Sequence, residues 1–411
     1  MTLLSGRFPV MTSRQKYAIL VGDGMADYPI AELGGLTPLA YASTPNLDWL
    51  ARTGTVGLVR TIPEGLLPGS DIGNLSLMGY DPHLFFTGRA PIEAAGLGIT
   101  ISGNQVAFRC NLVNLVHGRM VDYSGGRFTP EEAAALISSL KEGLDGPEVT
   151  LHLGSDYRHC LVMTGIEVKD MVSTPPHDIT GEPWQPHLPT GKSASRIIDI
   201  MERARDLLSD HPVNRNREAS GKSAANNIWL WGQGKALQLP TLQERFGLTG
   251  SVVSAVDLVK GLGILAGLEV ITVAGATGYL GTNYAGKVEA AAAALRKGDF
   301  VYMHVEAPDE TSHEGETSKK VQAIEEFDAH IVGPMIRLRE EFPELRIMVS
   351  PDHVTALSTR THASDPVPFV LSGRNVDVSN AASYCETAAA GSNILSGRLL
   401  FELLIGAETR V

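Results

Sequence analysis

The chain has 411 residues, of which 43% are hydrophobic and 19% are charged, and its formal net charge is −12 at pH 7. A chain of this length can bury a sizeable core, as two domains or as one large domain with an insertion. The acidic balance argues against general binding to nucleic acid or to an anionic membrane, because both need clustered Lys and Arg. The three cysteines are too far apart for a disulfide framework, which favours reduced thiols in the cytoplasm.

Residues 1–15 are expected to form an N-terminal extension without visible chemistry, since they lack the apolar stretch of a signal peptide. The most apolar region, Leu262 to Ala276, is interrupted by Glu269 and is too short to span a bilayer. No membrane segment is therefore expected.

Apolar strand patterns and helical patterns alternate in the first and last parts of the chain. Strands are expected at residues 17–21, 228–231, 270–273, 300–305, 347–350 and 367–371, and helices at 44–51 and 288–295. Between 98 and 186 the pattern changes to short β-like runs at 105–109 and 161–163 around a helix at 130–144. Residues 209–227 are rich in polar side chains and are expected to form a surface loop.

These patterns predict an α/β fold with an inserted domain. Residues 16–97 and 187–411 are expected to form one domain, in which helices flank a sheet. Residues 98–186 are expected to form a smaller α+β domain inserted into it.

Acidic and imidazole side chains follow the ends of several predicted strands. In open α/β sheets, ligands gather outside the carboxyl ends of the strands. The residues of this kind are Asp23, Asp309, His313, Asp352, His353 and His362. Each of them alone has an ordinary alternative as a turn, cap or surface residue. As a set they indicate two divalent metal ions, for which carboxylate and imidazole suit Mn²⁺ or Zn²⁺.

The spacing of these residues adds detail. Asp309 and His313 are four residues apart, so one helical turn would place both on the same face and let them chelate one ion. Asp352 and His353 are neighbours after a strand, and a sharp turn would be needed for both to bind the same ion. His362 precedes the strand expected at 367–371, where a loop could fold it over the metals.

Ser70 lies in the segment Gly69-Ser70-Asp71, where the glycine would let the backbone approach a ligand. A hydroxyl becomes a good nucleophile when a base or metal lowers its pKa, so Ser70 beside an ion would suit phosphoryl transfer. The alternative is a serine that only caps a helix.

The order of the motifs resembles the archaeal-type cofactor-independent phosphoglycerate mutases of the alkaline phosphatase superfamily, from about Lys16 to the C-terminus. The matching segments are Gly22-Asp23-Gly24-Met25, Pro68-Gly69-Ser70-Asp71, Pro176 to Gly181, Trp229 to Gly234, Glu306 to His313, Asp352-His353 and Thr361 to Pro368. In the bacterial and plant branch, Glu stands at the place of Asp71 and His at that of Asn74, so substrate contacts from these positions do not transfer.

The resemblance implies a role for each matching residue. Asp309, His313 and His362 would hold one metal, and Asp23, Ser70, Asp352 and His353 would surround the other, with Ser70 forming a phosphoserine. It also implies an alkaline-phosphatase-like sheet with an inserted substrate-binding lid. Basic residues would hold the substrate phosphate and carboxylate, and the candidates are Arg109, Arg158 and Lys260.

The expected function is interconversion of 3-phosphoglycerate and 2-phosphoglycerate without 2,3-bisphosphoglycerate. Two divalent ions are the expected cofactors, with Mn²⁺ favoured and Zn²⁺ as the alternative. The alternatives with the same metals are a homoserine kinase-like phosphotransferase and a metal-dependent phosphomonoesterase. A catalytically silent metalloprotein is a third hypothesis, which the presence of Ser70 beside all six ligands disfavours.

Overall fold

The computed structural model describes residues 15–407, so most of the expected N-terminal extension lies outside the described residues. The contacts divide the chain into two compact units. The first contains the chain up to Leu84, Pro240–Val259 and the chain from Ala266 onward, and the second contains Phe85–Leu239 and Lys260–Leu265. Within residues 15–407, no helix combines the length and apolar character needed to cross a membrane.

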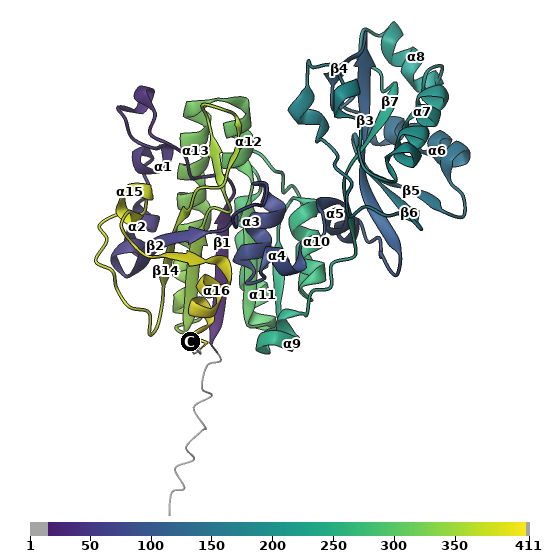
Figure 1. The fold of residues 1–411 in the computed structure, drawn as a ribbon. Helices are drawn as coiled ribbons and strands as arrows, with labels where there is room; N and C mark the ends of the chain where they lie inside the picture. Colours follow the sequence, from purple (N-terminus) through teal and green to yellow (C-terminus); the bar gives the residue numbers. More distant parts are fainter. Residues whose placement is uncertain (1–14, 408–411) are drawn as a thin grey trace, which may run out of the picture. The chain divides into compact units, whose positions relative to one another are not determined.

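The first unit is built on an eight-stranded sheet with the order β15-β2-β14-β11-β1-β10-β8-β9 (Figure 1). Its strands are β1 (Lys16–Gly22), β2 (Gly54–Arg60), β8 (Gly250–Val253), β9 (Glu269–Ile271), β10 (Phe300–Val305), β11 (Leu345–Ser350), β14 (Val367–Ser372) and β15 (Ile394–Ser396). Strand β1 pairs in parallel with both β10 and β11, so the carboxyl ends of these three strands lie at one edge. A separate two-stranded hairpin joins β12 (Val354–Ala356) to β13 (Thr361–Ala363).

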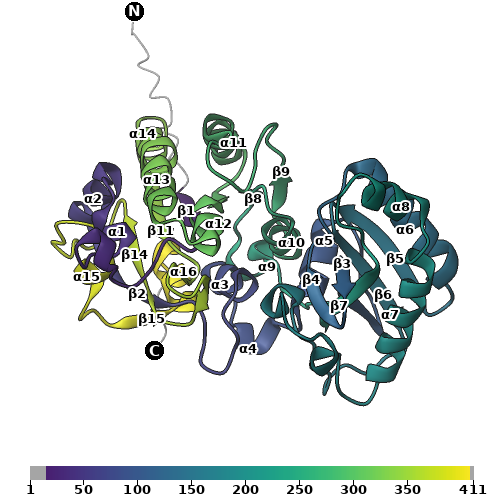
Figure 2. The same ribbon diagram turned by 90° about the horizontal axis from the view of Figure 1, so that it is seen from above.

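Helices cover this sheet. They are α1 (Pro38–Tyr41), α2 (Pro45–Arg52), α3 (Ser70–Leu77), α4 (Pro82–Phe85), α9 (Leu242–Phe246), α11 (Tyr284–Lys297), α12 (Ala307–Glu314), α13 (Thr317–Phe327), α14 (Gly333–Arg337), α15 (Glu386–Ala389) and α16 (Gly397–Ile405). Helix α10 (Asp257–Leu265) is divided between the two units. Figure 2 shows α11 and α13 on one side of the sheet, with α3 and α16 on the other. The predicted α/β class is confirmed.

The main hydrophobic core lies between the sheet and the helices α2, α11 and α13. Alternate residues of β10, namely Val301, Met303 and Val305, point into this core and are buried. The residues between them therefore face the other side of the sheet, because successive side chains of a strand point to opposite faces. Phe300 on that side packs against Phe401 of α16, with ring centroids 5.9 Å apart.

The second unit contains both helices and an antiparallel sheet. Its sheet has the order β4-β3-β6-β5, and β7 pairs with β3. The elements are α5 (Arg89–Gly96), β3 (Gln105–Val116), β4 (Arg119–Asp122), α6 (Pro130–Leu144), β5 (Val149–Ser155), β6 (Arg158–Thr164), α7 (Ala194–Leu208), α8 (Pro212–Ala219) and β7 (Asn227–Lys235). The helix expected at 130–144 matches α6, whose capping box between Thr129 and Glu132 sets its start.

The second unit is larger than the predicted insertion at 98–186. The strand expected at 228–231 is part of β7, which pairs antiparallel with β3 rather than joining the eight-stranded sheet. Local sequence shows that such a segment is a strand but does not show its partner, and β7 lies beyond the predicted boundary at 187. The surface loop expected at 209–227 also contains helix α8, where Asn214 and Arg217 are buried.

Candidate active site and metal centre

The first group of ligand-type side chains is formed by Asp309, His313 and His362. Asp309 and His313 lie one turn apart on α12, as their spacing predicts, and His362 comes from β13. The Nε2 atom of His313 lies 3.2 Å from Asp309 Oδ2 and 3.1 Å from Nε2 of His362. His362 Nε2 is also 3.5 Å from Asp309 Oδ1. These three ligand atoms can meet on one ion.

The electrostatics of this group fit metal binding. Although burial alone would raise it, hydrogen bonds from His313 and His362 hold the pKa of Asp309 well below its usual range. The carbonyl oxygen of Arg360 lies 2.9 Å from Nδ1 of His313 and can accept its proton. When Nε2 of His313 gives up the proton that it donates to Asp309, its lone pair can bind an ion while Nδ1 stays protonated, as is usual for metal-binding histidines.

The second group is formed by Asp23, Asp352 and His353, which follow β1 and β11. All three side chains are buried. Nε2 of His353 lies 3.5 Å from Asp23 Oδ1 and 3.5 Å from Asp352 Oδ2. Burial and the neighbouring Asp352 carboxylate raise the pKa of Asp23 well above its usual range, whereas burial lowers that of His353. Two carboxylates held together in this way call for a compensating positive charge.

Thr355 on β12 links the two groups. Its hydroxyl donates a hydrogen bond of 2.6 Å to Asp309 Oδ1 and lies 3.1 Å from Nδ1 of His353, whose proton it can accept. This arrangement leaves Nε2 of His353 with its lone pair directed at Asp23 and Asp352. The turn between Asp352 and His353 is thus sharp enough for both to reach one centre.

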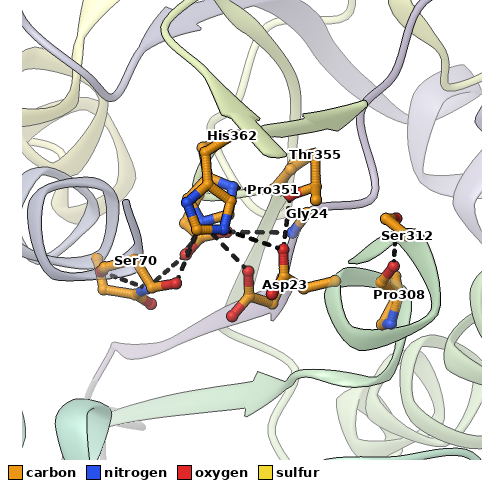
Figure 3. Close-up of polar contacts among 12 residues, drawn as sticks. Asp23, Gly24, Ser70, Pro308, Ser312, Pro351, Thr355 and His362 are labelled. Carbon is orange, nitrogen blue, oxygen red and sulfur yellow. Dashed lines mark hydrogen bonds and ion pairs between the residues drawn. The ribbon is translucent and has the colours of Figure 1, made fainter. Parts of the chain in front are cut away.

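Ser70 is the first residue of α3 and lies at the second group. Its Oγ is 3.1 Å from Nε2 of His353. The residue that caps α3 is Gly69, so the alternative of a serine that only caps the helix is wrong. Figure 3 shows Ser70, Asp23 and His362 converging on one region from three separate elements.

The donor set fits two divalent cations. Oδ1 of Asp23 is buried and has no hydrogen-bond partner among residues 15–407, although it lies within reach of His353. A buried carboxylate oxygen of this kind normally has a partner, and a cation would supply one. Asp309, His313 and His362 would hold one ion, while Asp23, Asp352, His353 and Ser70 would hold the other.

The predicted basic residues Arg109, Arg158 and Lys260 belong to the second unit. Arg109 on β3 is buried, its Nε lies 2.6 Å from Glu93 Oε2, and its guanidinium lies 4.2 Å from the ring centroid of Trp231. Arg158 begins β6 and lies over the ring of Tyr157 at 5.2 Å. Both arginines thus lie on the sheet of the second unit, each beside an aromatic ring.

Several further residues belong to the site. His304 Nε2 lies 2.9 Å from Asp23 Oδ2, Asn74 Nδ2 donates to Asp352 Oδ2 at 2.6 Å, and Thr355 joins the two groups. Burial lowers the pKa of His304 to about 4, so this imidazole is neutral. In the sequence, His304 could have been found as a polar residue within a mainly apolar strand.

Comparison with known proteins identifies the family. A model described as 2,3-bisphosphoglycerate-independent phosphoglycerate mutase matches residues 51–214. A curated protein of that name from Methanothrix thermoacetophila is 51% identical over 95% of this chain and 99% of its own length. A probable enzyme of the same name from Geobacter sulfurreducens is 48% identical over 95% of this chain and 99% of its own.

Solved structures agree with these relatives. A protein from Pyrococcus horikoshii superposes with a TM-score of 0.79 at 29% identity, covering 97% of this chain and 99% of that one. The cofactor-independent phosphoglycerate mutase of Thermoplasma acidophilum gives 0.63 at 28% identity, covering 95% and 99%. The order of motifs, the gathered ligands and the full-length relatives lead to one conclusion: the chain belongs to the family of 2,3-bisphosphoglycerate-independent phosphoglycerate mutases.

Proposed function

We propose that this protein interconverts 3-phosphoglycerate and 2-phosphoglycerate through a phosphoserine at Ser70. The observation that carries the proposal is the position of the Ser70 hydroxyl, 3.1 Å from His353 Nε2 at the edge of the second ligand group. A hydroxyl in that place can serve as a nucleophile, which metal binding alone would not require. The names of the full-length relatives support the same reaction.

The two ligand groups supply the electrostatics of the reaction. Bound divalent ions would lower the pKa of the Ser70 hydroxyl and neutralise the phosphoryl oxygens. We favour Mn²⁺ over Zn²⁺ because carboxylate oxygens contribute to both groups, and such ligands suit Mn²⁺. Asp23, Asp352 and His353 would hold the ion nearest Ser70. Asp309, His313 and His362 would hold the other.

Ser70 carries the phosphoryl group between the two positions of glycerate. Its oxygen attacks phosphorus in line, a new O–P bond forms, and the bond from phosphorus to the 3-oxygen of glycerate breaks. The 3-oxygen gains a proton as Ser70 loses its own. The 2-hydroxyl of the same glycerate then attacks the phosphoserine, the bond from phosphorus to the Ser70 oxygen breaks, and Ser70 regains a proton as the 2-hydroxyl loses its own. The phosphate comes from the substrate, so no bisphosphorylated primer is consumed.

We assign binding of the anionic groups of the substrate to Arg109, Arg158 and Lys260, and the role of a lid to the second unit. The ion pair with Glu93 and the face of Trp231 hold the Arg109 guanidinium in place before substrate arrives. A lid that excludes water would prevent hydrolysis of the phosphoserine during reorientation of glycerate. We also propose a cytoplasmic location, which the free and buried thiols of Cys110, Cys160 and Cys385 support.

The test is an enolase-coupled assay of purified protein with Mn²⁺ and 3-phosphoglycerate, without 2,3-bisphosphoglycerate. The proposal predicts steady formation of 2-phosphoglycerate and little free phosphate. Parallel reactions with homoserine and ATP, and with a simple phosphomonoester, test the two alternative activities. Absence of 2-phosphoglycerate from protein with bound Mn²⁺ would contradict the proposal.

A further inference from the structure

Strand β10 carries two buried polar side chains on the face that points away from the main core. Tyr302 and His304 are two residues apart and are only 0% and 1% exposed. A strand that is buried on both faces is ordinarily apolar on both. Buried polar groups are costly unless they form hydrogen bonds, so the partners of these two side chains define their role.

His304 contacts the carboxylate of Asp23 directly. Its Nε2 lies 2.9 Å from Asp23 Oδ2, and its Nδ1 lies 3.4 Å from the hydroxyl of Ser254. The oxygen of Ser254 already accepts the backbone N–H of Val256 at 3.0 Å, so the Ser254 hydroxyl can donate to Nδ1. The remaining ring proton then lies on Nε2 and is donated to Asp23. Oδ2 of Asp23 is thereby occupied, while Oδ1 faces His353.

Tyr302 contacts the carboxylate of Asp352 indirectly, through the side chain of Asn74. Its hydroxyl donates a hydrogen bond of 2.7 Å to Oδ1 of Asn74. Because an amide has its acceptor and its donors at opposite ends, this bond directs the NH₂ group of Asn74 towards Asp352. Nδ2 of Asn74 donates 2.6 Å to Asp352 Oδ2 and 2.8 Å to the carbonyl oxygen of Ser70.

We infer that β10 positions the two metal-binding carboxylates of the second group: His304 orients Asp23 directly, and Tyr302 orients Asp352 through Asn74. The inference rests on the proposed two-metal site and deepens it. Tyr302 and His304 act through the carboxylates and are positioning residues. His304 could alternatively be a metal ligand with Asp23 and Asp352, since these ligand atoms lie within 4.8 Å of one another. That role would require the ring proton of His304 to lie on Nδ1, facing Ser254, instead of on Nε2.

The first experiment compares Tyr302→Phe with Tyr384→Phe. Tyr384 is an equally buried tyrosine of the same unit, and its hydroxyl donates to the carbonyl oxygen of Pro368 at 2.8 Å. Both changes are made in a His362→Ala background, which disables the first ligand group, and Mn²⁺ affinity is measured by calorimetry. Loss of an outer-shell partner typically weakens metal binding by about 10- to 100-fold. That loss is expected for Tyr302→Phe, while Tyr384→Phe retains the affinity of its background.

The second experiment separates positioning by His304 from direct ligation. In the same background, His304→Gln keeps an N–H donor near the place of Nε2, whereas His304→Phe removes the donor and keeps a ring. Positioning predicts that Gln retains most of the Mn²⁺ affinity that Phe loses. Equal loss in the two variants would show that His304 binds the ion itself and would overturn its positioning role.

A repeat in an Asp352→Asn background assigns the effect to one ion. There Tyr302→Phe should leave the affinity of the Asp309, His313 and His362 group unchanged. Affinities that are the same with and without Tyr302→Phe in the His362→Ala background would overturn the inference. These are binding measurements, so such a result would leave the mutase proposal standing. Mn²⁺ binding as inferred, with no 2-phosphoglycerate formed by the unaltered protein, would contradict the mutase proposal alone.

Discussion

At the residue scale, the proposed mechanism gives Ser70 the most specific role. Its hydroxyl lies 3.1 Å from His353 Nε2, at the group that His353 forms with the buried carboxylates of Asp23 and Asp352. The change Ser70→Ala removes the nucleophile and retains Asp23, Asp352 and His353. We expect kcat to fall by roughly 10⁴-fold or more. Calorimetry should show that two Mn²⁺ ions still bind, and normal turnover in this variant would exclude Ser70 from the reaction.

The pH dependence of metal binding should report on His313. Burial lowers the pKa of this side chain, but the hydrogen bond and charge of Asp309 outweigh burial and raise it from 6.5 to about 9. In the metal-free protein the pair therefore adds stability that is fully present below pH 6.5 and is lost as the pH rises through about 9. An ion needs the neutral ring, so Mn²⁺ affinity should increase over the same range.

Calorimetry in two buffers measures whether Mn²⁺ binding releases this proton. At pH 7.5, binding of Mn²⁺ to the first group should release about one proton from His313, so the observed heat should differ between buffers with different ionisation enthalpies. His353 provides the contrast, because burial already holds its pKa well below the usual range. A heat of binding that is the same in both buffers would contradict the assignment.

At the element scale, the position of α3 depends on close contact between its backbone and the loop after β11. A β-carbon at Gly73 would overlap the carbonyl oxygen of Asp352. Ala has the higher helix propensity, by about 1 kcal/mol, but overlap with backbone atoms costs about 1–3 kcal/mol and moves α3. We expect Gly73→Ala to reduce kcat more than it reduces the free energy of unfolding, because Ser70 begins this helix.

Gly146→Ala is the matched control, since no atom lies within 4 Å of a β-carbon there. Its effect on the free energy of unfolding should stay within about 0.5 kcal/mol. Urea unfolding and the mutase assay together measure both effects. Full activity in Gly73→Ala would show that the approach of α3 to Asp352 is not needed for the site.

The elements also show what the sequence could predict. The segments that form β1, β10 and β11 are apolar runs, so the sequence predicts them as strands. Because β1 pairs in parallel with β10 and β11, the ligand-type residues that follow these strands lie at one edge of the sheet. The partner of β7 could not be predicted locally, because β3 lies more than a hundred residues earlier in the chain. The roles of Tyr302 and Asn74 likewise depend on α3 packing beside β10, which is a tertiary contact.

Helix α8 was missed for a similar reason. Its segment is polar, and the contacts that stabilise it come from elsewhere in the second unit. Nδ2 of Asn214 donates to two backbone carbonyls, and Arg217 pairs with Glu132 at 2.7 Å. Composition alone indicated a loop.

At the scale of the whole molecule, we expect the buried carboxylates to make the first unit dependent on cations. Asp23, Asp309 and Asp352 lie together in the interior, and the net charge of the chain is −12. EDTA treatment should abolish activity and lower the melting temperature, and Mn²⁺ should restore both. Each ion at 100 times its Kd stabilises the fold by about 2.7 kcal/mol. Differential scanning calorimetry and the mutase assay measure the two effects, and activity that survives verified metal loss would contradict the proposed site.

The most direct test of the phosphoserine mechanism is to trap the intermediate. Protein with Mn²⁺ is mixed with 3-phosphoglycerate, quenched in acid during turnover, digested, and examined by mass spectrometry. The mechanism predicts phosphate on the peptide that contains Ser70, formed and lost as fast as the enzyme turns over, and absent from Ser70→Ala. Phosphate on a different residue, or none on Ser70 while 2-phosphoglycerate accumulates, would contradict it.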